Sequence, residues 1–100
     1  MTERVVYFSF EQFSHRLPLK PDQIIEIVEL GIVDPHGSQP QNWQFDMTML
    51  AQARKACQLH QQLEVDWPGV ALALQLLHRL EKLEQENAQL KSHLARFVRL

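Results

Sequence analysis

The chain has 100 residues, of which 45% are hydrophobic and 22% are charged, and its formal net charge at pH 7 is −2. This length allows one small domain with an extension, and the apolar fraction is that of a folded protein. No apolar run is long enough to span a membrane, the first residues lack the pattern of a secretory signal, and the single Cys57 excludes an internal disulfide, so we expect a cytoplasmic protein.

Charge is distributed unevenly along the chain. Residues 1–66 carry five Lys/Arg against nine Asp/Glu, a net charge of −4, whereas residues 67–100 carry five against three, a net charge of +2. An acidic first part is a poor electrostatic match for the phosphates of nucleic acid. The composition therefore disfavours a nucleic-acid partner.

The first elements are short. Val5 to Phe10 is β-branched and aromatic, which predicts a strand. Ser9 with Gln12 three residues later has the capping-box pattern, so a short helix should begin there and bury Phe10, Phe13 and Leu17. This helix should end at Leu17, because a residue that precedes proline avoids the α region.

A second helix is predicted from Pro21 to Leu30, with Gly31 as the natural residue to end it. Its inner face consists of Ile24, Ile27 and Val28, with Ile25 beside them. Its outer face carries Asp22, Glu26 and Glu29, which the spacing of four and three residues places on one side. This face is either simply solvated or an acidic docking surface for a basic partner, and the residues alone favour the first interpretation.

A hairpin should follow this helix. Ile32 and Val33 begin it, residues 34–40 have turn and loop chemistry, and Trp43-Gln44-Phe45 alternates like a return strand. Trp43 is either a core residue or a partly exposed contact anchor. Asp46 should then cap a third helix from Met47 to about Leu63. The apolar face of this third helix consists of Leu50, Ala53, Cys57, His60 and Leu63.

The last third of the chain predicts one long helix. Asp66 is a good N-cap, Pro68 is tolerated in a first turn, and no later Pro or Gly interrupts the helix. Its apolar face is wide from Val70 to Leu80, which indicates core packing, and then narrows to a heptad seam. The residues that form this seam are Leu76, Leu80, Leu83, Asn87, Leu90, Leu94 and Phe97.

The narrow seam predicts a coiled coil with a second copy of the chain. Asn87 at an a position fits this interpretation, because a buried Asn fixes register and partner number at a cost in stability. A helix folded back within its own chain is disfavoured, since no second heptad segment exists to pair with. Strand direction stays open, because parallel and antiparallel pairings both bring opposite charges together.

No motif in the sequence indicates an enzyme, a cofactor or a metal. The five His residues are scattered, and Cys57 and His60 share a helix face without further ligands at a recognisable spacing. The chain has only three glycines and no phosphate-binding loop, and no nucleophile–base motif is present. We therefore expect a protein without catalytic activity.

The order of the elements resembles the MerR-type winged helix-turn-helix over nearly the whole chain. The similarity includes two short helices, the segment Gly31-Ile32-Val33-x-Pro35, an aromatic return segment, a third helix and a long final helix. The resemblance implies a mainly α fold with a small β-hairpin, a winged head over residues 1–65, and dimerisation through residues 66–100. In that family the second helix and the wing bind DNA, and the last helices form an antiparallel coiled coil between subunits.

Two departures from this family concern DNA binding. The family's return strand usually carries Arg between its aromatic residues, where this chain has Trp43 and Gln44. The helix that should read DNA presents Asp22, Glu26 and Glu29, which repel phosphate. The fold is therefore expected without the DNA-binding function.

Along its full length the sequence is also similar to the CbpM family of chaperone modulatory proteins. The similarity rests on Trp43-x-Phe45-Asp46, Asp66-Trp67-Pro68-Gly69-Val70-Ala71, Gln85-Glu86-Asn87 and Arg96-Phe97-Val98, in addition to the Gly31 turn. Asp-Trp-Pro-Gly is the most specific of these. The resemblance implies binding to the J-domain of CbpA, a DnaJ-like co-chaperone, and inhibition of both its stimulation of the Hsp70 DnaK and its DNA binding.

This resemblance gives the acidic face a partner. J-domains present a basic helix and an adjoining His-Pro-Asp loop to Hsp70, so an inhibitor is expected to offer acidic residues. We expect the J-domain to bind Asp22, Glu26 and Glu29, together with Asp34 and Trp43. The alternatives are a MerR-type dimeric transcription regulator that binds DNA and a dimeric adaptor with an unrelated partner.

Overall fold

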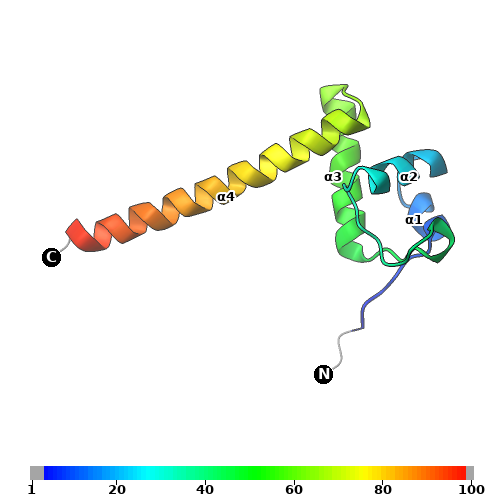
Figure 1. Cartoon of the computed structure of the whole chain (residues 1–100), viewed down its shortest axis with the longest axis horizontal. Coiled ribbons are helices and arrows are strands. Elements are labelled where there is room, and N and C mark those ends of the chain that lie inside the picture. Colours follow the sequence, from blue (N-terminus) through cyan, green and yellow to red (C-terminus); the bar gives the residue numbers. More distant parts are fainter. Residues whose placement is uncertain (1–3, 99–100) are drawn as a thin grey trace.

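The computed structural model of the chain describes residues 4–98. In chain order these residues form the helices α1 (Phe10–His15), α2 (Pro21–Glu29), α3 (Met47–Leu63) and α4 (Trp67–Val98), with the short 3-10 helix η1 (Pro40–Asn42) between α2 and α3. Figure 1 shows α1, α2 and α3 gathered at one end of the molecule, which we call the head, while α4 runs away from them. The described residues extend over 61 × 44 × 21 Å. Among the helices in this range, none has the length and apolar character needed to cross a membrane.

The start of α1 follows the predicted capping box. The Ser9 hydroxyl accepts a hydrogen bond from the Gln12 amide at 3.2 Å, and the Gln12 side-chain oxygen accepts one from the Ser9 amide at 2.9 Å. The helix ends at His15, slightly before the predicted Leu17, because Arg16 closes it with hydrogen bonds to the preceding turn. Phe13 and Leu17 are buried as predicted, and Phe10 is half-buried.

Helix α2 ends where the sequence predicts. Leu30 is its C-cap, and Gly31 follows with a φ of +75°, the left-handed conformation that glycine adopts without steric cost. The Ile32 amide donates to the Ile27 carbonyl at 3.0 Å, which satisfies a carbonyl at the end of the helix. Ile24 and Ile27 are fully buried, whereas Ile25, expected beside them, is half-exposed.

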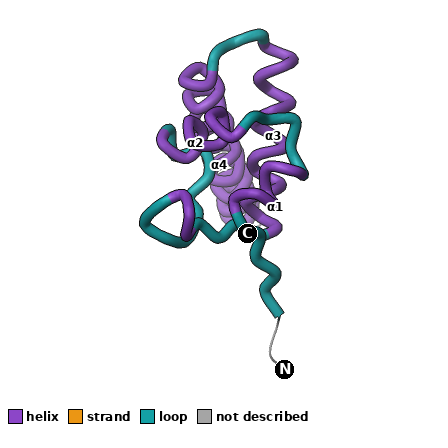
Figure 2. The backbone as a smooth tube through the Cα atoms, turned by 90° about the vertical axis from the view of Figure 1, so that its right-hand side faces the viewer, coloured by secondary structure: helices purple, strands orange, loops and turns teal. Residues whose placement is uncertain are grey.

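The predicted hairpin is reduced to two isolated β-bridges. Gln44 exchanges backbone hydrogen bonds with His36, and its neighbour Phe45 exchanges them with Phe8. Figure 2 shows loops and no regular strand in the described part of the chain. Each pairing stops after one residue, because helices lie close to the bridges: α1 begins at Phe10, η1 occupies Pro40–Asn42 and α3 begins at Met47.

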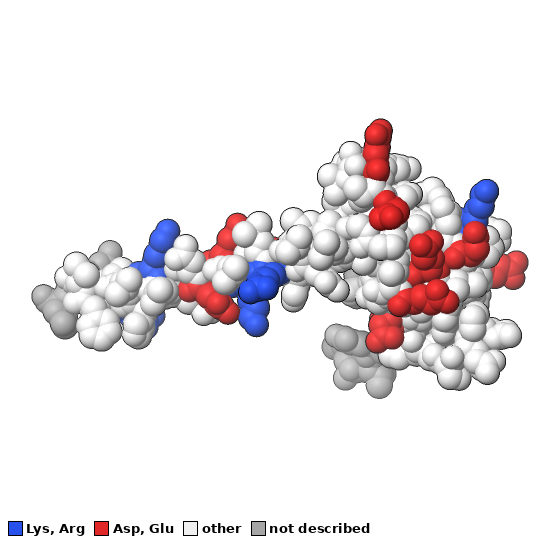
Figure 3. All heavy atoms as spheres, turned by 45° about the horizontal axis from the view of Figure 1, so that its top comes forward, with Lys and Arg blue, Asp and Glu red and all other residues white. Residues whose placement is uncertain are grey.

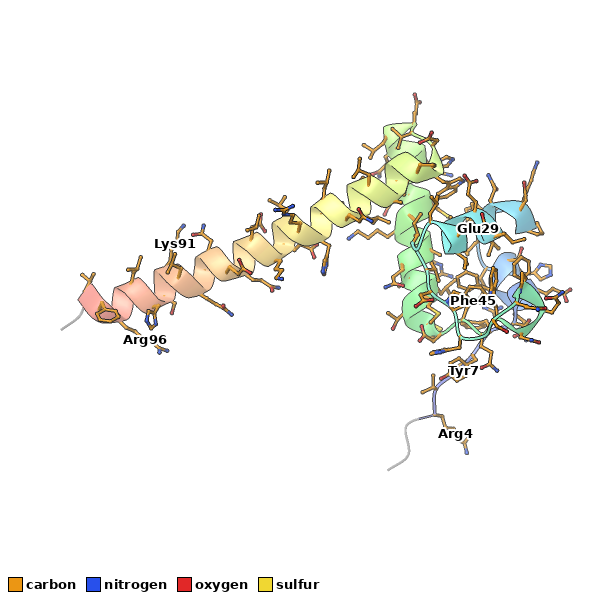
Figure 4. The ribbon with its side chains drawn as sticks, in the orientation of Figure 1. Arg4, Tyr7, Glu29, Phe45, Lys91 and Arg96 are labelled. Carbon is orange, nitrogen blue, oxygen red and sulfur yellow. The ribbon has the colours of Figure 1, made fainter. Side chains whose placement is uncertain are left out.

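The core of the head is built around two aromatic rings. Phe13 of α1 stacks on Phe45 with ring centroids 3.9 Å apart, and Figure 4 shows Phe45 inside the head. The residues buried around them come from all parts of the head and from the start of α4: Ile24, Ile27, Val33, Leu50, Ala53, Ala56, Cys57, Trp67 and Val70.

Helix α3 has the predicted limits and cap. The Asp46 carboxylate accepts a hydrogen bond from the Met49 amide at 2.9 Å. Leu50, Ala53 and Cys57 are buried, but the prediction for Leu63 is wrong, since this side chain is 51% exposed in the last turn. Burial raises the pKa of the Cys57 thiol, because desolvation disfavours the thiolate.

A tight connection joins α3 to α4. Glu64 ends α3 in the left-handed conformation with a φ of 53°, and the Asp66 carboxylate accepts a hydrogen bond from the Gly69 amide at 3.0 Å, which caps α4. A Cβ atom on Gly69 would lie 3.1 Å from the Asp66 Oδ1 atom and 3.2 Å from the Val65 Cβ atom. Trp67 is buried against the head. The Asp-Trp-Pro-Gly motif thus caps the helix, anchors it and allows the connecting segment to approach closely.

Helix α4 leaves the head earlier than the wide apolar face predicts. Val70 is fully buried and Leu74 is half-buried, but Leu72 and Leu76 are each more than half exposed. The expectation that the segment up to Leu80 is core packing is therefore corrected. Because α3 and α2 contact only the beginning of α4, most of this 32-residue helix extends beyond the head.

Candidate functional site

The acidic face of α2 consists of Asp22, Glu26 and Glu29. The helix buries Ile24 and Ile27 on its opposite side, which directs the three carboxylates outward. Asp22 and Glu29 are exposed, and Glu26 is half-exposed. Figure 3 shows acidic side chains gathered on one face of the head with few basic side chains among them.

The charges of this face are not compensated within the described part of the chain. The one salt bridge between residues 4 and 98 joins His15 and Glu11 of α1, with 3.8 Å between the Nε2 and Oε1 atoms. The carboxylates that accept backbone hydrogen bonds there belong to the caps Asp46 and Asp66, and not to α2. The acidic face is therefore available to basic groups of another molecule.

Asp34 and Trp43 lie outside α2. Asp34 is exposed in the loop after Gly31, between the buried residues Val33 and Pro35, and no side-chain hydrogen bond or salt bridge joins it to the acidic face within the described range. Trp43 follows η1 and is half-buried, with its ring centroid 5.9 Å from that of Phe10 and 6.1 Å from that of Phe45. The structure thus brings Asp22, Glu26 and Glu29 together on one face, while Asp34 and Trp43 come from the segment between α2 and α3.

A groove beside the acidic face was not predicted from the sequence. It lies between α1, α2 and η1, has a volume of about 470 Å³, and includes Phe10, Pro21, Ile25 and Pro40 in its lining. Ile25 directly follows the buried Ile24, so the sequence does indicate an apolar residue at the side of α2. Pro40 is distant in sequence, and only the fold brings it to this groove.

The second candidate surface is the leucine seam of α4. Its members are Leu76, Leu80, Leu83, Asn87, Leu90, Leu94 and Phe97, and the six apolar ones are 52% to 64% exposed. Such a continuous exposed apolar strip at heptad spacing is typical of a coiled-coil surface. The seam lies on the part of α4 that extends beyond the head (Figure 1).

The described residues do not bring together groups suited to metal binding. No cluster of three or more His, Cys, Asp or Glu side chains that could hold a metal ion occurs between residues 4 and 98. Cys57 and His60 both lie on α3, where Cys57 is buried in the core and His60 stacks on Trp67. The candidate functional features of this part of the chain are the acidic face, the groove beside it and the leucine seam.

Comparison with known proteins shows which family this chain belongs to. Residues 8–92 match the family described as "MerR HTH family regulatory protein". The chain is 42% identical over 96 residues to the chaperone modulatory protein CbpM of Pseudomonas putida W619, covering 96% of this chain and 95% of that protein. It is 49% identical over 77 residues to the CbpM of Pseudomonas putida KT2440, covering 77% and 76%, and 36% identical over 98 residues to that of Salmonella arizonae, covering 98% and 97%. With this fold and similarity over nearly its whole length, the chain belongs to the CbpM family of MerR-type helix-turn-helix proteins.

Proposed function

We propose that this protein is a non-enzymatic interaction module that binds the J-domain of a CbpA-type DnaJ homologue. By binding, it inhibits the stimulation of Hsp70 by that co-chaperone and also its DNA binding. The observation that carries the proposal is the uncompensated acidic face of α2, at Asp22, Glu26 and Glu29. The names of the relatives, which describe chaperone modulators, support the same function.

The mechanism is competition for one surface of the J-domain. The basic helix of a J-domain, which Hsp70 needs, pairs with the acidic face of α2, and Asp34 and Trp43 extend the contact. Charge pairs speed and orient the encounter, while a desolvated apolar contact supplies much of the affinity. The opposite side of α2 packs into the core through Ile24 and Ile27, which fixes the direction in which the acidic face points.

Two copies associate through the leucine seam in this proposal. The docking head corresponds to residues 1–65 and the dimerisation helix to residues 66–100, of which residues 1–3 and 99–100 lie outside the described part of the chain. Full burial of a Leu side chain is worth roughly 1.5–3 kcal/mol, and the seam offers five Leu and Phe97 per chain. Burial of the exposed seam would therefore favour association, and Asn87 would limit the register of the pair.

The alternative function is that of a MerR-type dimeric regulator that binds DNA. The helix-turn-helix family match over residues 8–92 favours it. Against it, the helix that should approach DNA presents three carboxylates, and contact with phosphate requires basic or neutral donors at that position. The two functions make opposite predictions for substitution of Glu26 and Glu29.

The test is a calorimetric titration of the full-length protein with an isolated CbpA-type J-domain at several salt concentrations. We expect tight binding that weakens with salt, and a loss well over tenfold in the double variant Glu26→Lys/Glu29→Lys. The matched control, Glu64→Lys/Glu81→Lys, has the same change in net charge away from the acidic face and should bind nearly as the wild type does. Absence of binding by the wild type would refute the proposal, and sequence-specific DNA binding by the wild type would favour the regulator.

A further inference from the structure

The groove between α1, α2 and η1 is apolar on the inside. Phe10, Pro21, Ile25 and Pro40 contribute to its lining, and Phe10 and Ile25 are each half-exposed there. Phe10 also contacts Trp43, which connects the groove to the expected aromatic anchor. A hydrophobic side chain of a partner would therefore meet a preformed apolar surface and not a loop that has to be rearranged.

Carboxylates border the groove on both sides. Ile25 lies three residues after Asp22 and four before Glu29, so it forms the edge of the acidic face on α2. On the opposite side Glu11 of α1 also contributes to the lining, and its salt bridge with His15 is long and fully on the surface. An apolar groove between two acidic borders favours an apolar group that carries positive charges on either side.

We propose that this groove receives one apolar side chain from a basic amphipathic helix of the partner. The inference rests on the proposed function and assigns the apolar part of that docking site to Ile25 and Phe10. Asp22 and Glu29 are seven residues apart, about 10 Å along α2. Basic residues one turn before and one turn after an apolar residue cover a similar length of the partner helix, so they reach both carboxylates while the apolar side chain enters the groove.

The decisive variants separate an apolar contact from charge attraction. Ile25→Ala removes the contact and leaves every charge, so affinity for the J-domain should fall about tenfold while its salt dependence stays unchanged. Ile25→Glu adds a carboxylate to the acidic face. If charge alone drives binding, this variant binds more tightly, whereas the groove predicts weaker binding than the wild type.

A matched control is available in Ile32. It is also half-buried, but it lines a different surface depression together with Leu74, where α4 leaves the head. Ile32→Ala should therefore leave J-domain affinity unchanged. Circular dichroism melting of each variant shows whether the head is folded, and Ile25, at the surface edge of α2, is expected to tolerate both substitutions.

The calorimetric titration used for the proposed function distinguishes the outcomes. A wild type that does not bind the J-domain overturns the proposed function and this inference together. A wild type that binds, with Ile25→Ala and Ile25→Glu of equal or higher affinity, overturns the groove alone. If J-domain binding is unchanged but sedimentation shows altered self-association in Ile25→Glu, the groove is a contact between copies of the chain, and the inference is also wrong.

Discussion

The imidazole ring of His60 lies flat on the indole ring of Trp67, with 4.2 Å between the ring centroids and 10° between the planes. This stack joins the end of α3 to the first turn of α4, where the long helix leaves the head. The Nδ1 atom of His60 is buried and has no hydrogen-bond partner among the described residues. The contact therefore combines favourable stacking with the cost of an unsatisfied polar atom.

Substitution of His60 separates these two contributions. His60→Phe keeps an aromatic ring against Trp67 and removes the unpaired nitrogen, so the free energy of unfolding should stay equal or rise by up to about 1 kcal/mol. His60→Ala loses the stack and should lower it by about 1–2 kcal/mol. Urea unfolding of both variants checks this prediction, which a stability loss in His60→Phe as large as in His60→Ala would contradict.

The end of α2 depends on the backbone conformation of Gly31. An alanine Cβ there would meet no atom within 4 Å, so a substitution adds strain without a clash. Because Gly31 has a φ of +75°, Gly31→Ala should lower the free energy of unfolding by about 1–2 kcal/mol. Gly31→Asn should lose less, since Asn tolerates the left-handed region better. Equal stability of Ala and Gly at this position in thermal melts would contradict the prediction.

If the leucine seam pairs two copies of the chain, the helix content of α4 beyond the head should rise with protein concentration. Leu83→Asp places a charge in the seam and should convert dimers to monomers, with a loss of helical signal because α4 beyond the head then has no packing partner. Gln85→Asp introduces the same charge at an exposed position outside the seam and should change neither quantity. Sedimentation equilibrium and circular dichroism measure both, and an unchanged mass for Leu83→Asp would locate self-association elsewhere.

The Cys57 thiol should be unreactive in the folded protein. It is buried in the core, and desolvation raises its pKa above the ordinary value of 9.0. The folded state therefore holds the thiol proton more tightly than the unfolded state does. The resulting contribution of Cys57 to the free energy of unfolding is fully present below the ordinary thiol pKa, and it is lost as the pH rises through the higher pKa of the folded state. Thiol-specific labelling should be slow until denaturant is added, and Cys57→Ala should lose less stability than the wild type above pH 9.0. Fast labelling without denaturant would contradict burial of this group.

Local signals in the sequence predicted the helix limits well. The residues that begin or end these helices interact only with their near neighbours in sequence, so they are recognisable without knowledge of the fold. They are the capping box at Ser9, the caps Asp46 and Asp66, and Gly31. Backbone pairing and burial depend on distant segments instead. The sequence therefore predicts more strand pairing than the two β-bridges of the structure, and it does not indicate the exposure of Leu72, which depends on where the head ends.

The candidate site also has one part that the sequence predicts and one part that only the fold brings together. The acidic face of α2 follows from helical spacing alone, and the structure does place Asp22, Glu26 and Glu29 on one face. The groove beside it needs Phe10, Ile25 and Pro40 from three elements, and no sequence pattern brings these together. Assignment of Asp34 and Trp43 to the docking surface stays a prediction, as does the partner itself.

The way α4 extends from the head has a consequence for binding strength. If two copies pair through the leucine seam of α4, as proposed, the pair carries two acidic faces, one on each head. Such a pair is bivalent, and a partner assembly that carries two J-domains would meet the second head at a high effective concentration once the first has bound. Inhibition of such an assembly would then gain from avidity, and a monomeric variant with an intact acidic face would lose this gain.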